Sequence, residues 1–384
     1  MIEKALTGDR RYWGWILALL GVIGIGSLFY LRQLTVGLTI TGLSRDVTWG
    51  FYIAQFTFMV GVAASAVMVV LPYYLHDFKV FGRIAILGEF LAIGSVIMCI
   101  LFIMVDLGQP SRAFNMFLHP SPRSILFWDT IVLSGYLVLN ALIAHQTLKA
   151  EDQGTAPPSW VKPLIYLSIP WAISIHTVTA FIYQGLAARP YWMTAILAPR
   201  FLASAFSSGP ALLILICLAL RRLTRFDAGK EAIQKLATIV TYAVLINLFF
   251  VLMEVFTAIY SGIPEHVAHF QYLFLGLDGH AELVPWMWAG QVLALGALVV
   301  LLRPSVRNQT GWLAAACVAI VVSVWIEKGL GMIVAGFNPS PLGHVTRYVP
   351  TAPEFFIGLG VYGIGALIVT ILYKTALSVR GEVA

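Results

Sequence analysis

The chain has 384 residues, of which 59% are hydrophobic and only 11% are charged. This composition, with a mean hydropathy of +0.86, excludes a soluble globular domain and predicts an integral membrane protein. The net charge of +6 comes mostly from loops on one side of the membrane, where anchoring to anionic headgroups explains it, so it does not indicate a nucleic-acid partner.

Ten apolar stretches are each long enough to cross a bilayer, which takes about 20 helical residues. In chain order they cover residues 12–31, 48–75, 83–105, 124–145, 163–184, 200–220, 235–261, 282–302, 311–336 and 355–376. Backbone groups in lipid must be satisfied within the element, and the stretches lack the alternation of a β-barrel. We therefore expect ten transmembrane helices and an all-α, polytopic fold.

The connections differ in charge between the two sides of the membrane. Sixteen Lys and Arg residues lie on the side of the two termini. The seven on the other side are Arg32, Arg45, Arg112, Arg123, Arg189, Arg200 and Arg347. Since positive residues stay cytoplasmic, we expect both termini in the cytoplasm and the protein in the cytoplasmic membrane.

The spans also indicate a domain organisation. Spans two to five and spans six to nine form two four-helix bundles of the same orientation, with one flanking helix on either side. This divides the chain into a first helix with its outer loop (1–47), a first bundle (48–199), a second bundle (200–354) and a last helix with a cytoplasmic tail (355–384). The outer connections are long and rich in turn residues, which favours a docking surface for partners.

The metal-binding residue types argue against a resident redox centre. Cys99, Cys217 and Cys317 lie in separate spans, too far apart in sequence for a cluster motif. A haem between membrane helices needs two facing histidines, and only His176 lies well inside a predicted span, since His76 and His145 are at cytoplasmic ends. We expect no haem, no iron–sulfur cluster and no metal site in this chain.

Ionisable residues within the spans are the strongest functional signal. Each costs about 2.5–3.5 kcal/mol on insertion scales, so such residues are rarely without a role. They are Glu89, Asp129, His176, Glu254, Glu327 and Lys328, with Asp106 at a span end. With the predicted orientation, all but Glu89 lie in the outer half of the membrane. Glu89 is close to the inner loop, where it either reaches water or has a function.

Helical phase brings some of these residues together with other polar side chains at one outer depth. The residues are Tyr52 and Gln55 in span two, Asp106 in span three, and His176, Thr179 and Tyr183 in span five. Apolar walls with a few hydrogen-bonding groups suit a small amphipathic ligand such as a quinone, and a histidine beside a carboxylate can accept its protons. The alternative is that His176 only bonds across helices.

A second set of polar residues suggests proton movement. Asp129, Tyr136 and Asn140 form a stripe on span four that runs inward. In the second bundle Lys328 can neutralise Glu254 or Glu327 as a structural ion pair, or the three can relay protons. Both readings of the second bundle are open at this point.

Several motifs are shared with a known family. The runs are TWGFYIAQFTFMVGVAASA, DLGQPSRAFNMFLHPSPRS, PRFLASAFSSGPA, and WIEKGLGMIVAGFNPSPLG with RYVPTAPE. Over nearly its whole length the chain resembles the NrfD/polysulfide-reductase membrane-subunit family. Within that family it is most similar to the P subunits of the Dsr electron-transfer complexes of sulfur-metabolising prokaryotes, or to their Hme homologues.

The resemblance implies a quinone-reactive subunit without a cofactor of its own, with menaquinone bound near the outer face of the first bundle. The implied pocket residues are Tyr52, Gln55, Asp106, His176, Thr179 and Tyr183. Some relatives carry His or Asn on the first bundle helix, where this chain has Gln55. The family's proton routes use buried acids, here Asp129, Glu254 and Glu327.

The implied partners are other subunits of one respiratory complex. They are an outer-face ferredoxin-type iron–sulfur subunit, a multihaem cytochrome c, a b-type cytochrome membrane subunit and a cytoplasmic iron–sulfur subunit. Two other functions fit the same spans: a secondary transporter, or a membrane anchor without a quinone site. Transporters usually show helices broken at matched positions of their two halves.

Overall fold

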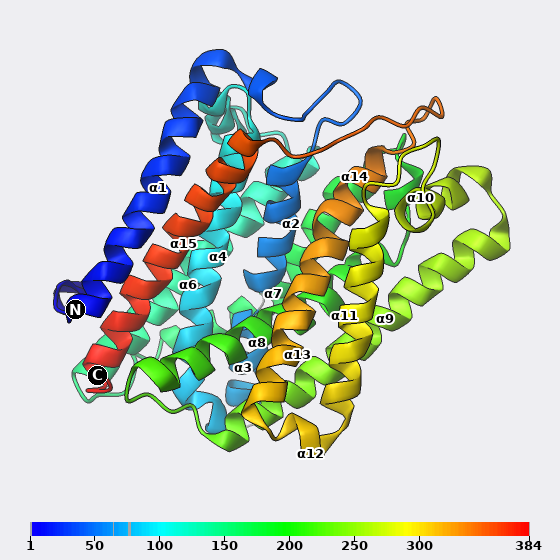
Figure 1. Ribbon diagram of the computed structural model, residues 1–384. Coiled ribbons are helices and arrows are strands. Elements are labelled where there is room, and N and C mark those ends of the chain that lie inside the picture. Colours follow the sequence, from blue (N-terminus) through cyan, green and yellow to red (C-terminus); the bar gives the residue numbers. More distant parts are fainter. Residues whose placement is uncertain (1, 64, 76–77, 384) are drawn as a thin grey trace.

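The computed structural model describes residues 2–63, 65–75 and 78–383 (Figure 1). Within these residues it contains helices and no strand. The long helices are α1 (Arg10–Val36), α2 (Phe51–Ala63), α3 (Ser65–Leu75), α4 (Gly82–Asp106), α6 (Ile125–Asp152), α7 (Val161–Gln184), α8 (Leu197–Leu223), α9 (Lys230–Ser261), α11 (Val284–Leu302), α13 (Thr310–Val324) and α15 (Ala352–Val379).

Shorter helices fill the connections. They are η1 (Ile2–Leu6), η2 (Leu38–Ile40), η3 (Lys79–Phe81), η4 (Pro110–Phe114), α5 (Asn115–Leu118), η5 (Pro190–Trp192), α10 (Pro264–Phe274) and α12 (Pro304–Arg307). Span nine continues from α13 through the π-helical η6 (Trp325–Gly331) into α14 (Met332–Phe337). Among the described residues, ten helical segments are long and apolar enough to cross a membrane, which confirms the ten predicted spans.

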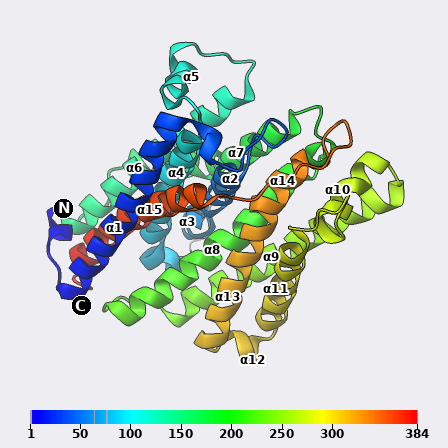
Figure 2. The same cartoon turned by 45° about the horizontal axis from the view of Figure 1, so that its top comes forward.

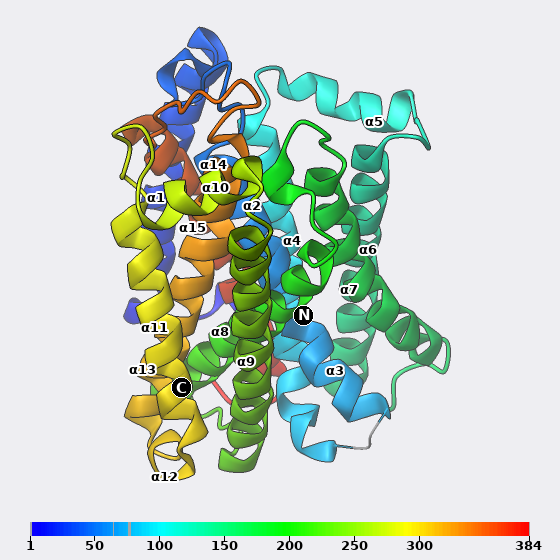
Figure 3. The same cartoon turned by 90° about the vertical axis from the view of Figure 1, so that its right-hand side faces the viewer.

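The two chain ends lie at the same end of the molecule, as an even number of spans requires (Figure 1). We call the opposite end the outer end, after the predicted orientation, which itself stays a prediction. The outer end carries most of the irregular chain, including α5 and α10 (Figures 2 and 3). The protein is thus a multi-pass membrane protein whose long connections gather on one side.

Helix α2 lies at the centre of the fold. All of its residues from Phe51 to Ala63 are buried, because the sequence is apolar on every side and neighbouring helices surround it. It packs against α4, α7, α8, η6 and α15. A polar side chain on α2 therefore points to a different neighbour depending on its position along the helix.

The two predicted bundles share one apolar core. Helices α4 and α7 pack against α2, with α6 against both of them, and α9 and α13 pack against α8, with α11 against both of them. Small residues bring the two groups together: a Cβ at Gly209 would lie 3.2 Å from the Ser65 backbone nitrogen, and Gly61 faces Ala205. The domain boundaries at residues 47, 199 and 354 stay a prediction.

Span nine departs from regular helix at the motif WIEKGLG. Gly329 there has φ −81° and ψ −110°, and the surrounding turn is π-helical. Such turns are frequent at functional sites because they re-aim side chains. Span five corresponds to span nine, since each is the last span of its bundle, and span five is the single helix α7. The paired helix breaks expected of a transporter are therefore absent from these two described segments.

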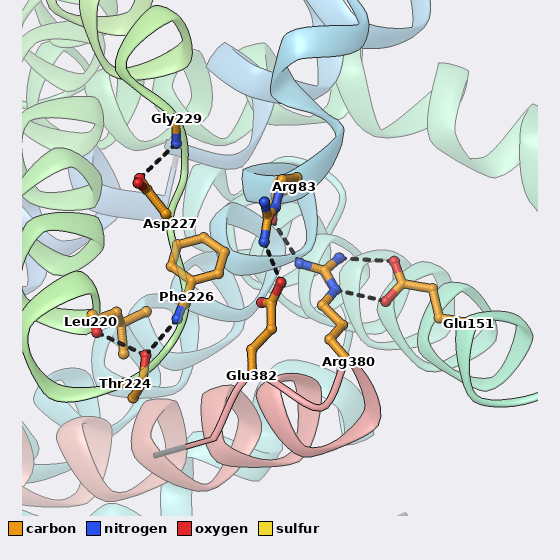
Figure 4. Close-up of polar contacts among 9 residues, drawn as sticks. All are labelled: Arg83, Glu151, Leu220, Thr224, Phe226, Asp227, Gly229, Arg380 and Glu382. Atoms are coloured by element: carbon orange, nitrogen blue, oxygen red, sulfur yellow. Dashed lines mark hydrogen bonds and ion pairs between the residues drawn. The ribbon is translucent and has the colours of Figure 1, made fainter.

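Ion pairs join the helices at the end where the termini lie (Figure 4). Arg380 donates two hydrogen bonds of 2.8 and 2.9 Å to the Glu151 carboxylate and a third of 2.8 Å to the Arg83 carbonyl. Arg83 pairs in turn with Glu382, and its guanidinium lies 5.7 Å from the centre of the Phe226 ring. The tail after α15 is thereby connected to α4, α6 and the loop between α8 and α9.

We expect Arg380→Gln to lower the free energy of unfolding by about 1 kcal/mol, because it removes a two-pronged contact that is only partly exposed. Thermal unfolding in detergent should show the loss at low salt and a smaller loss at high salt. Lys235→Gln is the matched control, since Lys235 forms a single, more exposed 2.9 Å pair with Glu231 besides its contact with the Phe78 ring. An equal loss for both variants would contradict this role of Arg380.

At the outer end, His269 connects α10 to the last turn of span nine through hydrogen bonds. Its Nδ1 lies 2.8 Å from both the Ala335 and the Asn338 carbonyl oxygens, so Nδ1 carries a proton and donates it. Burial lowers the pKa of His269 below its usual 6.5, and the nearby His266 and Arg189 act in the same direction against the two carbonyl contacts.

This lowered pKa predicts a pH-dependent α10. Below about pH 6.5 the unfolded segment binds a proton more readily than the folded one, so the stability from neutral His269 is complete above that pH and is lost as the pH falls. Hydrogen exchange of α10 should quicken in acid. In His269→Gln the pH dependence should flatten, while His119→Gln should keep it; an unchanged profile in His269→Gln would show that another group is responsible.

Candidate functional site

His176 is the most unusual polar residue of the fold. Its side chain is 0% exposed in the middle of α7, and neither ring nitrogen has a hydrogen-bond partner among the described residues. The ammonium of Lys328, from span nine, is close enough for an electrostatic interaction with it. A buried imidazole with two unpartnered nitrogens is costly unless something else in the working protein binds it.

Two hydrogen bonds organise the helix face that carries His176. Thr179, one turn further along α7, donates to Asp129 Oδ1 on α6 at 2.7 Å. Tyr183, a further turn along, has its hydroxyl 2.5 Å from the Thr57 hydroxyl on α2. The structure therefore brings Asp129 to the predicted row His176, Thr179 and Tyr183, between α6, α7 and α2.

Aromatic side chains close this row toward the outer end. The ring of Tyr183 lies 5.7 Å from Trp49 and 5.2 Å from Trp192, and Phe337 packs edge-on against both tryptophans. Trp192 is fully buried, and its indole nitrogen donates to the Met332 carbonyl at 3.0 Å. These rings pack against Tyr183, about two helical turns from His176.

Tyr52 and Asp106 have contacts of their own, different from those of His176. The Tyr52 hydroxyl donates to Gln33 Oε1 at 2.8 Å, and Gln33 Nε2 donates to the Val105 carbonyl at 2.6 Å, which joins α2, α1 and α4. Asp106 Oδ1 is buried without a partner among the described residues, and Asp106 interacts electrostatically with Glu354. Within the described part of the chain, no hydrogen bond connects this group to His176.

Gln55 points in a third direction. Its Oε1 accepts from the Trp325 indole at 2.7 Å and from the Tyr362 hydroxyl at 2.6 Å, while its Nε2 has no partner in the described ranges. Helix α2 thus directs Tyr52 and Gln55 to different neighbours, and its Thr57 meets Tyr183. No hydrogen bond among the described residues joins the predicted pocket residues to one another, although all of them are in the outer half of their spans and Asp106 interacts electrostatically with Tyr52 and Tyr183.

The charges of the second bundle are paired differently from the sequence prediction. Arg200 binds both carboxylates: its guanidinium contacts Glu254 and lies 2.5 Å from Glu327 Oε1. Lys328 instead donates to the Phe201 carbonyl at 3.3 Å and lies 4.2 Å from the centre of that ring. Of the two alternatives for these charges, the ion pair is thus made by Arg200, while Lys328 interacts with Glu327 only electrostatically, and the proton relay stays a prediction. Arg200 lies within α8 and not in an outer connection.

A charge count over the spans is the signal that points to Arg200. Two buried acids beside one lysine leave a negative charge unpaired, and a buried charge requires a partner. Arg200 is the first residue of predicted span six, and it is only 8% exposed in the structure. Glu354 was also missed: it is 0% exposed and accepts hydrogen bonds from Gly42, Thr351 and Tyr348.

The predicted inward stripe on α6 is buried as a whole. Tyr136 donates to the Ala63 carbonyl at 3.5 Å, and Asn140 Nδ2 donates to the Tyr136 carbonyl at 2.8 Å. Further toward the end with the termini, Glu89 is 4% exposed and its Oε2 has no partner among the described residues. Glu89 therefore does not reach water directly, which was one of the two expectations for it.

A family model and several known proteins match this chain over most of its length. The family model for polysulphide reductase, NrfD, matches residues 39–337. A putative membrane subunit of the dimethyl sulfoxide reductase of Halobacterium salinarum is 29% identical over 94% of this chain and 89% of its own length.

Two further relatives are less identical in sequence, and the match again covers most of both chains. A subunit of the selenate reductase of Mesobacillus selenatarsenatis is 23% identical over 93% of this chain and 91% of its own length. The Hdr-like menaquinol oxidoreductase integral membrane subunit of Archaeoglobus fulgidus is 23% identical over 97% and 95%. The resemblance drawn from the motifs is confirmed at the level of the family: the chain belongs to the polysulphide reductase NrfD family.

Proposed function

We propose that this chain is the quinone-reactive membrane subunit of a multi-subunit electron-transfer complex, with menaquinone or menaquinol as its substrate. The observation that carries the proposal is His176, a fully buried imidazole whose two nitrogens have no partner in the described part of the chain, on the same helix as Thr179, which binds Asp129. The name of the Archaeoglobus relative, a menaquinol oxidoreductase subunit, supports the same substrate.

The chemistry of a quinol suits these groups. A quinol is flat and mostly apolar, with two oxygens that exchange hydrogen bonds and release protons on oxidation. His176 can accept a hydrogen bond or a proton on one ring nitrogen and donate from the other. Thr179 binds Asp129 to the same helix through its 2.7 Å hydrogen bond, and the rings of Trp49 and Trp192 pack against Tyr183.

The electrons must continue to another subunit, since we propose no redox centre in this chain. We infer an outer-face iron–sulfur protein of ferredoxin type as the immediate partner, docked on the connections that include α5 and α10. A multihaem cytochrome c, a b-type cytochrome membrane subunit and a cytoplasmic iron–sulfur protein complete the proposed complex of sulfur metabolism. The Dsr P-subunit type, to which the motifs are most similar, is the proposed branch of the family, in the cytoplasmic membrane with both termini inside.

Coupled proton movement is a further part of the proposal. The first candidate route leads from Asp129 along Tyr136 and Asn140, all on one buried side of α6. The second uses Glu254, Glu327 and Lys328, but Arg200 holds both carboxylates, so a proton passing there must first break that contact. The geometry therefore favours the Asp129 route.

We expect the purified wild-type protein to contain extractable menaquinone, and His176→Phe to lose it. His176→Gln, which keeps a polar group of similar size, should reduce quinol oxidation by the complex by about a hundredfold or more, the usual contribution of a proton-accepting group. His145→Gln is the control, because His145 is exposed at the far end of α6. Wild-type protein without quinone, or unchanged oxidation in both His176 variants, would refute the proposed site.

Asp129→Asn tests the proton route. Asparagine can still accept the Thr179 hydrogen bond, so the fold should be kept while the titratable oxygen is lost. In proteoliposomes that contain the complex we expect quinol oxidation to continue with clearly less proton uptake per electron. Thr241→Ser, buried in α9 with a bond to its own helix, is the control. Unchanged coupling in Asp129→Asn would count against this route.

A further inference from the structure

A short helix at the outer end stands apart from the bundles. The 3-10 helix η4 runs directly into α5, because Phe114 at the join has right-handed helical backbone angles of φ −66° and ψ −17°. Residues 110–118 therefore form one continuous helical segment, which contacts α4 and α6. Figures 2 and 3 show this segment lying across the outer end of α6, crosswise to the spans.

This segment has one side that is apolar and open. Phe114, Phe117 and Leu118 are three and four residues apart, so they share a side of the helix. They are 62%, 61% and 69% exposed. Ala113 and Met116, on the side toward the protein, are only partly exposed. The three large side chains therefore have most of their apolar surface uncovered by the described residues.

A different side of the same segment is polar. It carries four exposed residues, Ser111, Arg112, Asn115 and His119. At about 100° per residue these four lie on a side of the helix away from the three large apolar residues. The segment is thus amphipathic, although it is not part of the packed core.

The charges around this segment are all positive. Residues 107–128 contain Arg112 and Arg123, and they contain no Asp or Glu. Both arginines are exposed. A guanidinium forms strong, two-pronged hydrogen bonds with a phosphate group. The connection is therefore suited in charge to the phosphates of lipid headgroups.

The apolar side continues into a surface that faces the bilayer. Ile125, Leu126 and Trp128, in the first turns of α6, are exposed, and exposed apolar residues of a membrane span face lipid. The Trp128 indole nitrogen donates to the Pro122 carbonyl at 2.8 Å, which connects the loop after α5 to α6. Tryptophan is enriched at the depth where lipid chains meet headgroups.

We propose that the segment 110–118 lies in the outer interface of the bilayer, with Phe114, Phe117 and Leu118 among the lipid chains and with Arg112 and Arg123 bound to lipid phosphates. An amphipathic helix at a membrane surface takes this orientation. The inference needs only the membrane location of the chain and does not rest on its proposed function. The iron–sulfur partner proposed above meets the polar side of the segment, which stays in water.

Fluorescence quenching of the full-length protein in nanodiscs tests the position of this segment. The probe is an NBD group on Phe117→Cys, and the three native cysteines stay unlabelled because they are buried. Phe117 is exposed, so its replacement keeps the fold. We expect a phospholipid with a nitroxide on its chain to quench the probe strongly, and aqueous iodide to quench it weakly.

Two positions serve as matched controls. Asn115→Cys lies on the polar side of the same segment, and Leu342→Cys lies on another outer connection, where Leu342 is 84% exposed. Probes at both positions should respond to iodide more than to the nitroxide lipid. Equal iodide quenching at positions 115 and 117 would place both sides of the segment in water and overturn the proposal.

The arginines are tested by the charge of the lipid. In discs that contain phosphatidylglycerol, Arg112→Gln and Arg123→Gln should each lower the ratio of lipid-embedded to water-exposed probe at position 117 by about fivefold. Arg45→Gln, an exposed arginine before α2, is the control and should leave the ratio unchanged. A ratio that stays constant in the double variant would refute the phosphate contacts.

The same measurement on the whole complex distinguishes a lipid from a protein partner. Quenching of the position 117 probe by the nitroxide lipid should persist when the other subunits are present. If the probe becomes shielded from both quenchers only in the complex, the apolar side is a docking face for a subunit and the lipid contact is wrong. Neither result bears on the quinone site at His176.

Discussion

The cost of burying a hydrogen-bonding group in a medium without water is the constraint on which this structure depends. Within lipid every polar atom must find a protein partner, and most of those described do. Arg200 satisfies two carboxylates at once, and Glu354 accepts from three donors. The few described atoms that remain unpaired include both ring nitrogens of His176, where we place the ligand.

The central position of α2 determines which helices supply the partners of its polar residues. A helix buried on every side distributes its polar residues among several neighbours, so Tyr52 meets α1, Gln55 meets η6 and α15, and Thr57 meets α7. The two bundles are joined along the same helix.

The irregular turn of span nine makes contacts with both α2 and α8. It directs Trp325 toward Gln55, while the next residues, Glu327 and Lys328, contact α8. A regular helix would place successive side chains about 100° apart, and the additional residue in a π-helical turn changes that spacing. The motif WIEKGLG is thus the segment in which span nine departs from a regular α-helix.

The amino-acid sequence by itself determined the ten spans, the burial of Asp129 and His176, and the family, because hydrophobic length and motif spacing are properties of the chain alone. It did not reveal that Arg200 is the partner of Glu254 and Glu327, or that Trp325 and Tyr362 hold Gln55. Those contacts join residues 54 to 307 positions apart, and only tertiary packing decides them. Helical phase predicts which residues share a side of one helix, but the neighbour that each side meets is set by how all the helices pack.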